Sequence, residues 1–390
     1  MSYMQGVAAG PDGQLVVVDR NERTVTIFPR PELLLTCPKC GIAKYCDEDC
    51  QSARKYEQGA LGPLCDLCPH TKELKDSSEL RIQLEKLSRY VNEDILPDRA
   101  QLESLYGKTT CNCFAIHNLD LREIGVGLYP QAAMINHSCK SNCVSTFRGP
   151  TLQIRALVDI QPGEEVCYSY TEKGNVTHER RDELRKYFFE CQCPHCLDTD
   201  RDAIMKSVKC PSCQGQVKPT SSDRYEKCSS CGFTDFTTEF YEDLEIYIHV
   251  EFDLLFRENC LVELDKILHP DNIHVVRILV GAFAASVKLE EWTKAIDYGK
   301  RLDRAFGLYL PPNEPDTGLL YYKMGKAYYH LDDIENAVTS LRKAKTLLSI
   351  AYGRDSQLVD YAQDWLELCG DYGSSSEEEE TDSETSCPSS

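Results

Sequence analysis

The chain lacks a long apolar run, an excess of basic residues and a secretion signal. No hydrophobic stretch approaches the roughly 20 residues of a membrane helix, so we expect no membrane span. The first residues, MSYMQGVAAGPDG, lack the basic start and apolar core of a signal peptide. Lys and Arg total 43 against 63 Asp and Glu. The net charge of -20 argues against a nucleic-acid or anionic-membrane surface and is compatible with basic protein partners.

Cysteine is abundant, with 21 among the 390 residues, and most cysteines stand in closely spaced pairs. In a reducing compartment this spacing predicts thiolate metal sites instead of disulfides, and zinc is the usual metal of such sites. Two residues separate the members of the pairs Cys37/Cys40, Cys65/Cys68, Cys193/Cys196, Cys210/Cys213 and Cys228/Cys231. Three residues separate Cys46 from Cys50, and one separates Cys191 from Cys193.

The first 31 residues predict a small β unit. A turn at Pro11-Asp12-Gly13 leads into a strand over Leu15–Asp19, and a polar turn leads into a second strand over Thr24–Phe28. The pattern resembles one NHL-type propeller repeat, and a single copy cannot close a propeller. A fused or mis-joined segment is the alternative interpretation.

Beyond a small cysteine-rich segment, the spacing of apolar residues separates helical from β-type segments. Residues 76–106 have helical spacing. Residues 109–170 alternate short β-like runs with turns and predict a compact, non-parallel β unit. Residues 177–190 predict a short polar helix that leads into the next cysteine cluster.

From about residue 238 to 369 the pattern predicts helices throughout. Within this segment, large and small residues are spaced as in one tetratricopeptide unit of about 34 residues, and an ordinary antiparallel helix pair is the alternative. The matching positions are Tyr321, Met324, Gly325, Tyr328, Ala337, Leu341 and Ala344. The last residues, GSSSEEEETDSETSCPSS, predict a disordered acidic tail.

The segment 136–196 carries four motifs in order: NHSC, PGEE, Tyr170 and YFFECQCPHC. This order resembles the C-terminal half of a SET methyltransferase domain followed by its post-SET zinc site. The cluster CPKCGIAKYCDEDC lies upstream and the tetratricopeptide-like helices lie downstream. The whole arrangement, over roughly residues 32–369, resembles the SET-and-MYND (SMYD-type) protein-lysine methyltransferases.

The resemblance implies an α+β fold with a SET-type β core, a MYND-like zinc finger, a post-SET zinc site and a C-terminal all-α, tetratricopeptide-like domain. In this family a Gly-x-Gly-containing β segment precedes the finger, and residues 1–31 contain no matching run, so we expect an N-terminally truncated SET core. The expected segments are an NHL-like β-hairpin fragment (1–31), a partial MYND finger (32–70), a helical SET insert (71–108), the C-terminal half of the SET core (109–176), a post-SET zinc segment (177–200), a zinc-ribbon insertion (207–232), the helical domain (238–369) and a disordered tail (370–390).

The resemblance implies S-adenosylmethionine as the cofactor, Tyr170 as the catalytic tyrosine and Tyr187 as the second tyrosine of a lysine channel. Tyr168 lies on the same strand face, but the register after the PGEE motif favours Tyr170. Methyl transfer needs a positioned, desolvated, neutral amine, and tyrosine hydroxyls and backbone carbonyls provide this without added charge. The residues expected to bind the cofactor are Asn112, Ile135, Asn136, His137, Tyr170 and Phe189.

Two complete four-cysteine zinc sites are expected. The resemblance implies a post-SET site that pins the C-terminal segment against the active site, whereas a ribbon without Cys139 is the alternative. We expect His195 to face solvent. The post-SET ligands would be Cys139, Cys191, Cys193 and Cys196. The spacing of the second set predicts a zinc ribbon with a structural role, formed by Cys210, Cys213, Cys228 and Cys231.

A third cysteine group resembles an incomplete MYND finger, with at most one intact zinc. It lacks the family's first cysteine pair and its final H-x3-C, so Cys46 and Cys50 would have no partners. Cys37 and Cys40 could close a site with Cys65 and Cys68, or with His70 in place of one of them. The candidate ligands are Cys37, Cys40, Cys46, Cys50, Cys65 and Cys68.

Two functional hypotheses follow. The first is an S-adenosylmethionine-dependent protein-lysine N-methyltransferase acting on histones or other basic proteins, whose activity the missing SET segment puts in question. The second is a catalytically silent scaffold in transcription regulation, which binds partners through its zinc modules and helical repeats. In either case the resemblance implies proline-rich partners for the MYND-like finger and a location in the nucleus and cytoplasm.

Overall fold

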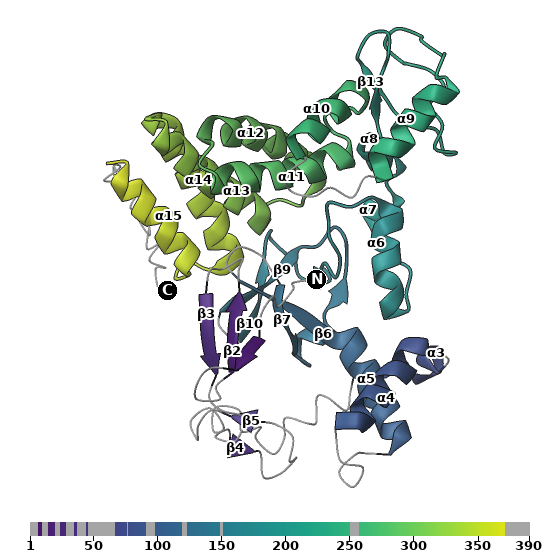
Figure 1. The fold of residues 1–390 in the computed structure, drawn as a ribbon, viewed down its shortest axis with the longest axis vertical. Helices are drawn as coiled ribbons and strands as arrows, with labels where there is room; N and C mark the ends of the chain where they lie inside the picture. The colour runs from purple at the N-terminus through teal and green to yellow at the C-terminus, as the bar shows by residue number, and fades with distance from the viewer. Residues whose placement is uncertain are drawn as a thin grey trace, which may run out of the picture. The chain divides into compact units, whose positions relative to one another are not determined.

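The computed structural model describes residues 67–75, 77–90, 98–118, 123–148, 151–249 and 257–370, without the side chains of 86–90, 246–249 and 257–259, and the backbone of five short strands before residue 46. The chain divides into two compact units, Met1–Thr199 and Asp200–Ser390 (Figure 1). No helix in the described part of the chain has the length and apolarity needed to cross a bilayer.

The first strands of unit 1 confirm the predicted hairpin. Strand β2 (Leu15–Asp19) pairs antiparallel with β3 (Thr24–Phe28), and β1 (Val7–Ala9) adds to the other edge of β2. Strand β4 (Leu35–Thr36) pairs with β5 (Lys44–Tyr45). Most of the predicted finger and nearly all of the predicted acidic tail lie outside the described residues.

The predicted helical insert consists of α3 (Thr71–Leu74), α4 (Ser78–Tyr90) and α5 (Arg99–Asn112). Helix α5 begins where the Asp98 side chain accepts a hydrogen bond from the Gln101 amide (2.8 Å). It continues past the expected end at residue 108, which places Cys111 and Asn112 in its last turn instead of in the β core.

The β core contains two antiparallel pairs, β6–β7 and β9–β10, and one parallel pair, β8–β11. The expectation of a non-parallel unit is therefore wrong for β8 and β11, which the β9–β10 hairpin separates along the chain. The strands are β6 (Cys113–His117), β7 (Glu123–Leu128), β8 (Asn136–His137), β9 (Cys143–Arg148), β10 (Thr151–Ala156) and β11 (Cys167–Tyr168), with a 3-10 turn η3 (Ala132–Met134) before β8. Phe114, Cys143 and Tyr168 form the buried centre.

After the core, α6 (Thr177–Leu184) leads through the 3-10 turn η4 (Arg185–Tyr187) to α7 (Pro194–Leu197). The helix predicted over 177–190 is thus shorter than expected. The 3-10 turn that follows it ends at Phe188, whose left-handed backbone (φ 60°) does not allow a helix to continue.

Unit 2 begins with α8 and a small zinc-ribbon hairpin and continues as helices. Neighbouring helices from α11 to α15 pack in sequence order (Figure 1), and the predicted tetratricopeptide positions are buried in α13 and α14. The elements are α8 (Thr199–Met205), β12 (Val208–Lys209), β13 (Gln216–Val217), α9 (Thr238–His249), α10 (Arg257–Ile267), α11 (Ile273–Lys288), α12 (Trp292–Tyr309), α13 (Pro315–His330), α14 (Ile334–Tyr352) and α15 (Gln357–Leu368).

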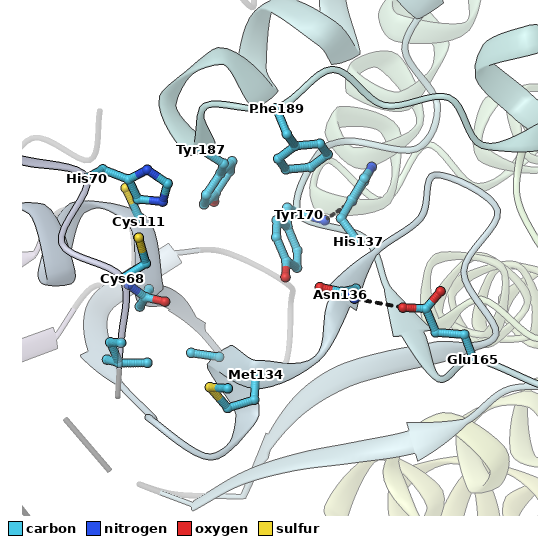
Figure 2. A pocket seen from close by; sticks show the side chains of 13 residues that line it. Cys68, His70, Cys111, Met134, Asn136, His137, Glu165, Tyr170, Tyr187 and Phe189 are labelled. Carbon is cyan, nitrogen blue, oxygen red and sulfur yellow. Dashed lines mark hydrogen bonds between the residues drawn. The ribbon is translucent and has the colours of Figure 1, made fainter. Parts of the chain in front are cut away.

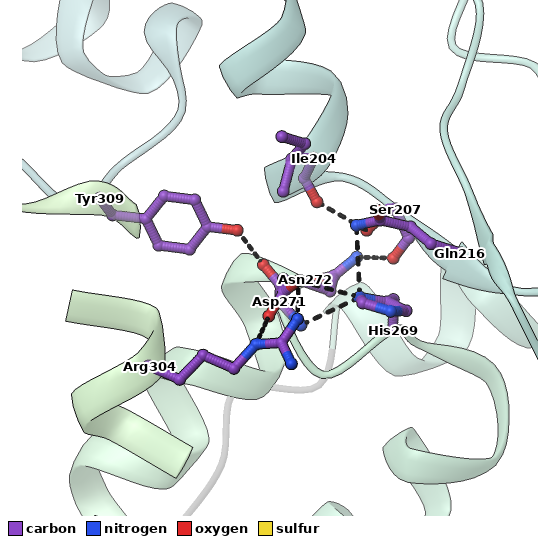
Figure 3. Close-up of polar contacts among 8 residues, drawn as sticks. All are labelled: Ile204, Ser207, Gln216, His269, Asp271, Asn272, Arg304 and Tyr309. Atoms are coloured by element: carbon purple, nitrogen blue, oxygen red, sulfur yellow. Dashed lines mark hydrogen bonds and ion pairs between the residues drawn. The ribbon is translucent and has the colours of Figure 1, made fainter. Parts of the chain in front are cut away.

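A polar network ties the ribbon to the helices of unit 2 (Figure 3). The Asn272 amide donates to the backbone oxygen of Ser207 (2.9 Å), and Gln216 of β13 donates to the Ser207 hydroxyl (3.0 Å). The neighbouring Asp271 accepts two hydrogen bonds of 2.9 Å from Arg304 of α12. Because these groups are largely buried and paired, the network fixes the ribbon on the helical domain.

Replacing Gly325 by alanine is expected to destabilise the α13–α14 pair. An added Cβ would lie 2.6 Å from Leu341 Cγ, so we expect the free energy of unfolding to fall by about 1–3 kcal/mol. Gly307→Ala in α12 is the control, since its Cβ would meet no atom within 4 Å, and it should stabilise by about 0.5–1 kcal/mol. Denaturant unfolding measures both changes. Equal effects would show that the close α13–α14 approach does not contribute.

Candidate active site and metal centre

The parallel β8–β11 pair brings two distant motifs together. Asn136 lies opposite Cys167, and His137 lies opposite Tyr168. The buried Asn142 side chain supports the pair, because its Nδ2 donates to the Glu165 carbonyl (2.8 Å) and its Oδ1 accepts from the Cys167 amide (2.9 Å). The NHSC and PGEE motifs and the strand leading to Tyr170 therefore meet at one place.

His137 links Tyr170 to a cysteine of the metal-binding motif. Its Nδ1 accepts a hydrogen bond from the Tyr170 amide (2.9 Å), so the ring proton belongs on Nε2, which lies 3.2 Å from Cys139 Sγ. Burial lowers the pKa of His137 to about 4, and the imidazole is neutral near pH 7. Both ring nitrogens are thus engaged by the protein, so contacts with a cofactor would come from the His137 backbone.

The Tyr170 hydroxyl donates a hydrogen bond to the backbone oxygen of Ile135. The Tyr170 ring lies 5.0 Å from that of Tyr187 and 6.4 Å from that of Phe189, measured between centroids. Burial raises the pKa of Tyr170 to about 12, which keeps the phenol neutral. Tyr168 is more deeply buried, and its ring lies 5.5 Å from that of Phe114 and 4.8 Å from that of Tyr170 between centroids.

A cavity of about 520 Å³ opens beside Tyr170 (Figure 2), a volume within the range of small-molecule sites. The predicted cofactor or channel residues that line it are Asn112, Asn136, His137, Tyr170, Tyr187 and Phe189. Ile135 does not line it and instead provides the carbonyl that holds Tyr170. Residues that the sequence analysis did not assign also line it, namely Leu67, Cys111, Ala133, Met134 and Glu165.

Asn136 is oriented by the carboxylate of Glu165. Its Nδ2 donates to Glu165 Oε1 (2.7 Å; Figure 2). A carboxylate only accepts, so the amide nitrogen must face Glu165 and the Asn136 Oδ1 remains as an acceptor for a ligand. Asn112 also lines the cavity, and its Nδ2 donates to the Lys108 carbonyl (2.7 Å), which likewise leaves its Oδ1 as an acceptor. These amides and the aromatic rings suit a ligand with an amine and a planar ring.

Two residues proposed for the MYND-like zinc site also line this cavity. Cys68 and His70 lie near Cys111 (Figure 2), and His70 packs on Phe188 at 4.8 Å between ring centroids. Neither Cys68 nor His70 belongs to a metal-ligand group among the described residues. The remaining candidates, Cys37, Cys40, Cys46, Cys50 and Cys65, lie outside the described residues, so the ligands of this finger stay a prediction.

The structure brings together the four cysteines expected to form the post-SET site. Their sulfur atoms all lie within 4.8 Å of one another, and Cys139 Sγ is 3.5 Å from Cys196 Sγ. This arrangement includes Cys139 and so speaks against a ribbon without it. The site suits zinc, because hydrogen bonds from the Cys139 and Cys196 thiols lower the pKa of Cys193 and favour a thiolate there. His195 is half-buried and contributes no ligand atom to the group.

The metal-binding group is continuous with the tyrosines of the cavity. Tyr170 and Tyr187 pack against a core formed by Leu184 and three of the cysteines, Cys139, Cys191 and Cys196. A metal held by these sulfurs would therefore fix the wall of the cavity as well as the C-terminal segment.

The ribbon cysteines form a second group in unit 2 that suits zinc. The sulfurs of Cys210, Cys213, Cys228 and Cys231 lie within 4.8 Å of one another. Its two knuckles have equivalent backbone hydrogen bonds, since the Gln214 amide donates to the Cys210 carbonyl and the Gly232 amide donates to the Cys228 carbonyl, each at 2.9 Å. None of these four cysteines is among the residues that line the cavity.

The sequence analysis missed Arg180, which is completely buried beside the post-SET cysteines. Its segment, THERRDELRK, is rich in charge and predicts a polar helix. The signal was the helical spacing of Thr177, Arg180 and Leu184, which places all three on the buried face of α6.

The comparisons with known proteins agree with this geometry. The SET domain family matches residues 25–171, and the match begins inside β3. N-lysine methyltransferase SMYD2-A of Danio rerio is 26% identical over 89% of this chain and 88% of its own length. Histone-lysine N-methyltransferase SMYD3 of Homo sapiens is 28% identical over 87% of this chain and 85% of its own length. N-lysine methyltransferase SMYD2 of Mus musculus is 23% identical over 90% of each chain.

The core pairing and the Asn-His motif lie within the segment that the SET domain family matches, and the four-cysteine site adjoins it. The fold is the expected α+β fold. The similarity to SMYD2 and SMYD3 extends over about nine-tenths of the chain and includes the C-terminal helices. The chain is therefore similar to SET-domain proteins of the SMYD type.

Replacing Cys191 by serine should remove one zinc ion from the protein. Because three thiolates and a hydroxyl hold zinc poorly, we expect the metal content to fall by about one equivalent and the tyrosine wall to loosen. Cys213→Ser is the control, since it should also remove one zinc but leave the cavity unchanged. Elemental analysis counts the metal, and fluorescence quenching by a bound cofactor analogue reports on the cavity. A Cys191→Ser protein with full zinc content would contradict the site.

Replacing Glu165 by alanine should weaken cofactor binding. Loss of the 2.7 Å hydrogen bond frees the Asn136 amide to rotate, and because both groups are exposed we expect about a fivefold loss of affinity. Glu164→Ala is the matched control, because Glu164 accepts only from the Gln161 amide in the preceding turn. Calorimetric titration with S-adenosylhomocysteine measures both. Equal affinities for the two variants would rule out the role of Glu165.

Proposed function

We propose that the chain is an S-adenosylmethionine-dependent protein-lysine N-methyltransferase. The observation that carries this proposal is the position of the Tyr170 hydroxyl on the Ile135 carbonyl, inside a cavity that is also lined by Tyr187 and Asn136. When bound, S-adenosylmethionine supplies a methyl group that its sulfonium has already activated. The chain's own residues then need only to position and desolvate the acceptor amine.

The proposed roles follow from the surroundings of each residue. Tyr170 and Tyr187 form an aromatic wall that removes water from a lysine side chain, which lowers the pKa of its amine and favours the neutral nucleophile. The backbone oxygen of Ile135 and the neutral phenol of Tyr170 orient that amine. Asn136 and Asn112 offer acceptors for the polar end of the cofactor, and Phe189 offers a ring for stacking.

Basic proteins, histones among them, are the proposed substrates. The chain has a net charge of -20, which attracts cationic segments. One relative is named as a histone-lysine and others as N-lysine methyltransferases, which supports both kinds of target. We further propose proline-rich partners for the MYND-like finger. The free thiols of the described residues suit the reducing nucleus and cytoplasm, where we propose that the protein works.

A binding role for the helical domain is the second candidate. Trp292 stacks on His330 with ring centroids 4.4 Å apart, His330 contacts Trp365, and Lys326 lies over the Trp365 ring. Aromatic residues that are partly exposed on helical repeats are typical of partner-binding surfaces. If this were the only function, the zinc-loaded protein would bind partners but give no heat with S-adenosylmethionine.

Replacing Tyr170 by phenylalanine should abolish methyl transfer but not cofactor binding. Loss of the hydroxyl removes the group that orients the amine, and we expect a loss of at least about 100-fold in kcat. The affinity for S-adenosylhomocysteine should stay within a few-fold. Tyr168→Phe, two residues earlier, is the matched control and should retain activity within about tenfold. Transfer of a radiolabelled methyl group to histones measures both, and a fully active Tyr170→Phe variant would refute the assignment.

A further inference from the structure

Arg180 is a completely buried cation without a carboxylate partner. Its side chain and backbone have no solvent exposure, and its hydrogen bonds go to the Thr177 hydroxyl (2.8 Å), the backbone oxygens of Asn175 and His195, and Cys196 Sγ (3.5 Å). No carboxylate lies within ion-pair distance among the described residues. Arginine is almost never fully buried unless it is paired with an anion.

The anion that can pair with Arg180 is the four-cysteine group itself. Four thiolates around one Zn²⁺ carry a formal charge of about −2, which is costly to bury. A guanidinium next to Cys196 would reduce this charge to about −1 and donate a hydrogen bond to a ligand sulfur. The remaining contacts of Arg180 hold both α6 and the start of α7, so the cation cannot turn away from the sulfurs.

We propose that Arg180 is a positioning residue that retains zinc in the site formed by Cys139, Cys191, Cys193 and Cys196 by compensating its negative charge. The inference rests on zinc in this site and not on methyl transfer, so it stands or falls separately from the proposed activity. The ribbon site of unit 2 provides a contrast within the same chain. Among the described residues its sulfurs contact no arginine, and two of its four cysteines are exposed to water.

The test measures the rate at which the folded full-length protein loses zinc to a chromogenic chelator. Cys191→Ser and Cys213→Ser each remove one kinetic phase and so assign the phases to the two sites. Arg180→Gln retains donors for the backbone oxygens but removes the charge, and Arg180→Lys retains the charge without the planar fork. Arg185→Gln is the matched surface control, because Arg185 is exposed and pairs only with Asp182 (2.9 Å).

We expect Arg180→Gln to lose zinc at least about tenfold faster from the post-SET site, Arg180→Lys to be intermediate, and the ribbon phase to stay unchanged. Arg185→Gln should behave as the wild type. A rate for Arg180→Gln within twofold of the wild type, or an Arg180→Lys variant as fast as Arg180→Gln, would overturn the proposal. So would a wild-type protein without zinc in this site.

A second measurement applies if Arg180→Gln folds poorly. Its melting temperature is followed as zinc is added, because a defect in metal retention is corrected by mass action and a packing defect is not. We expect the melting temperature of Arg180→Gln to rise more steeply with zinc than that of the wild type. Equal slopes would show that Arg180 acts through packing alone and would overturn the proposal.

Discussion

The site depends on the pairing of two very short strands, β8 and β11. Two residues on each strand make too few backbone hydrogen bonds to hold a parallel pair alone. Side chains complete it, since Asn142 bonds to the backbone on both sides of β11 and His137 accepts from the Tyr170 amide. The position of the proposed catalytic tyrosine is thus determined by buried polar side chains more than by the sheet.

The same histidine connects this pairing to the metal-binding group. A neutral imidazole that accepts at Nδ1 and donates at Nε2 can satisfy Tyr170 and Cys139 together, which a protonated imidazole cannot. Cys139 in turn belongs to the group that packs against Tyr170 and Tyr187. His137, Cys139 and Tyr170 are therefore linked to one another by continuous contacts. Through these contacts a change at the metal-binding cysteines would alter the cavity.

The sequence predicts those features whose spacing has a single physical interpretation. The paired cysteines, the hairpin Leu15–Asp19 and Thr24–Phe28, and the large and small positions of α13 and α14 were found in this way. Strands as short as β8 and β11 have no periodicity to detect, so their parallel pairing was missed. Arg180 was missed because charged residues surround it along the chain and obscure its helical spacing with Thr177 and Leu184, the other buried residues of α6.

The electrostatics of the cavity agree with a cationic ligand. Glu165 is the one carboxylate among the described residues that line it, and its hydrogen bond turns the Asn136 carbonyl toward the ligand. The Tyr170 phenol stays neutral, because burial raises its pKa to about 12. A positively charged ligand thus meets acceptors at one end and uncharged rings at the other. The hydrogen-bond acceptors would hold the amine and carboxylate end of a sulfonium cofactor at Asn136. The uncharged aromatic wall would then remain free to desolvate a lysine.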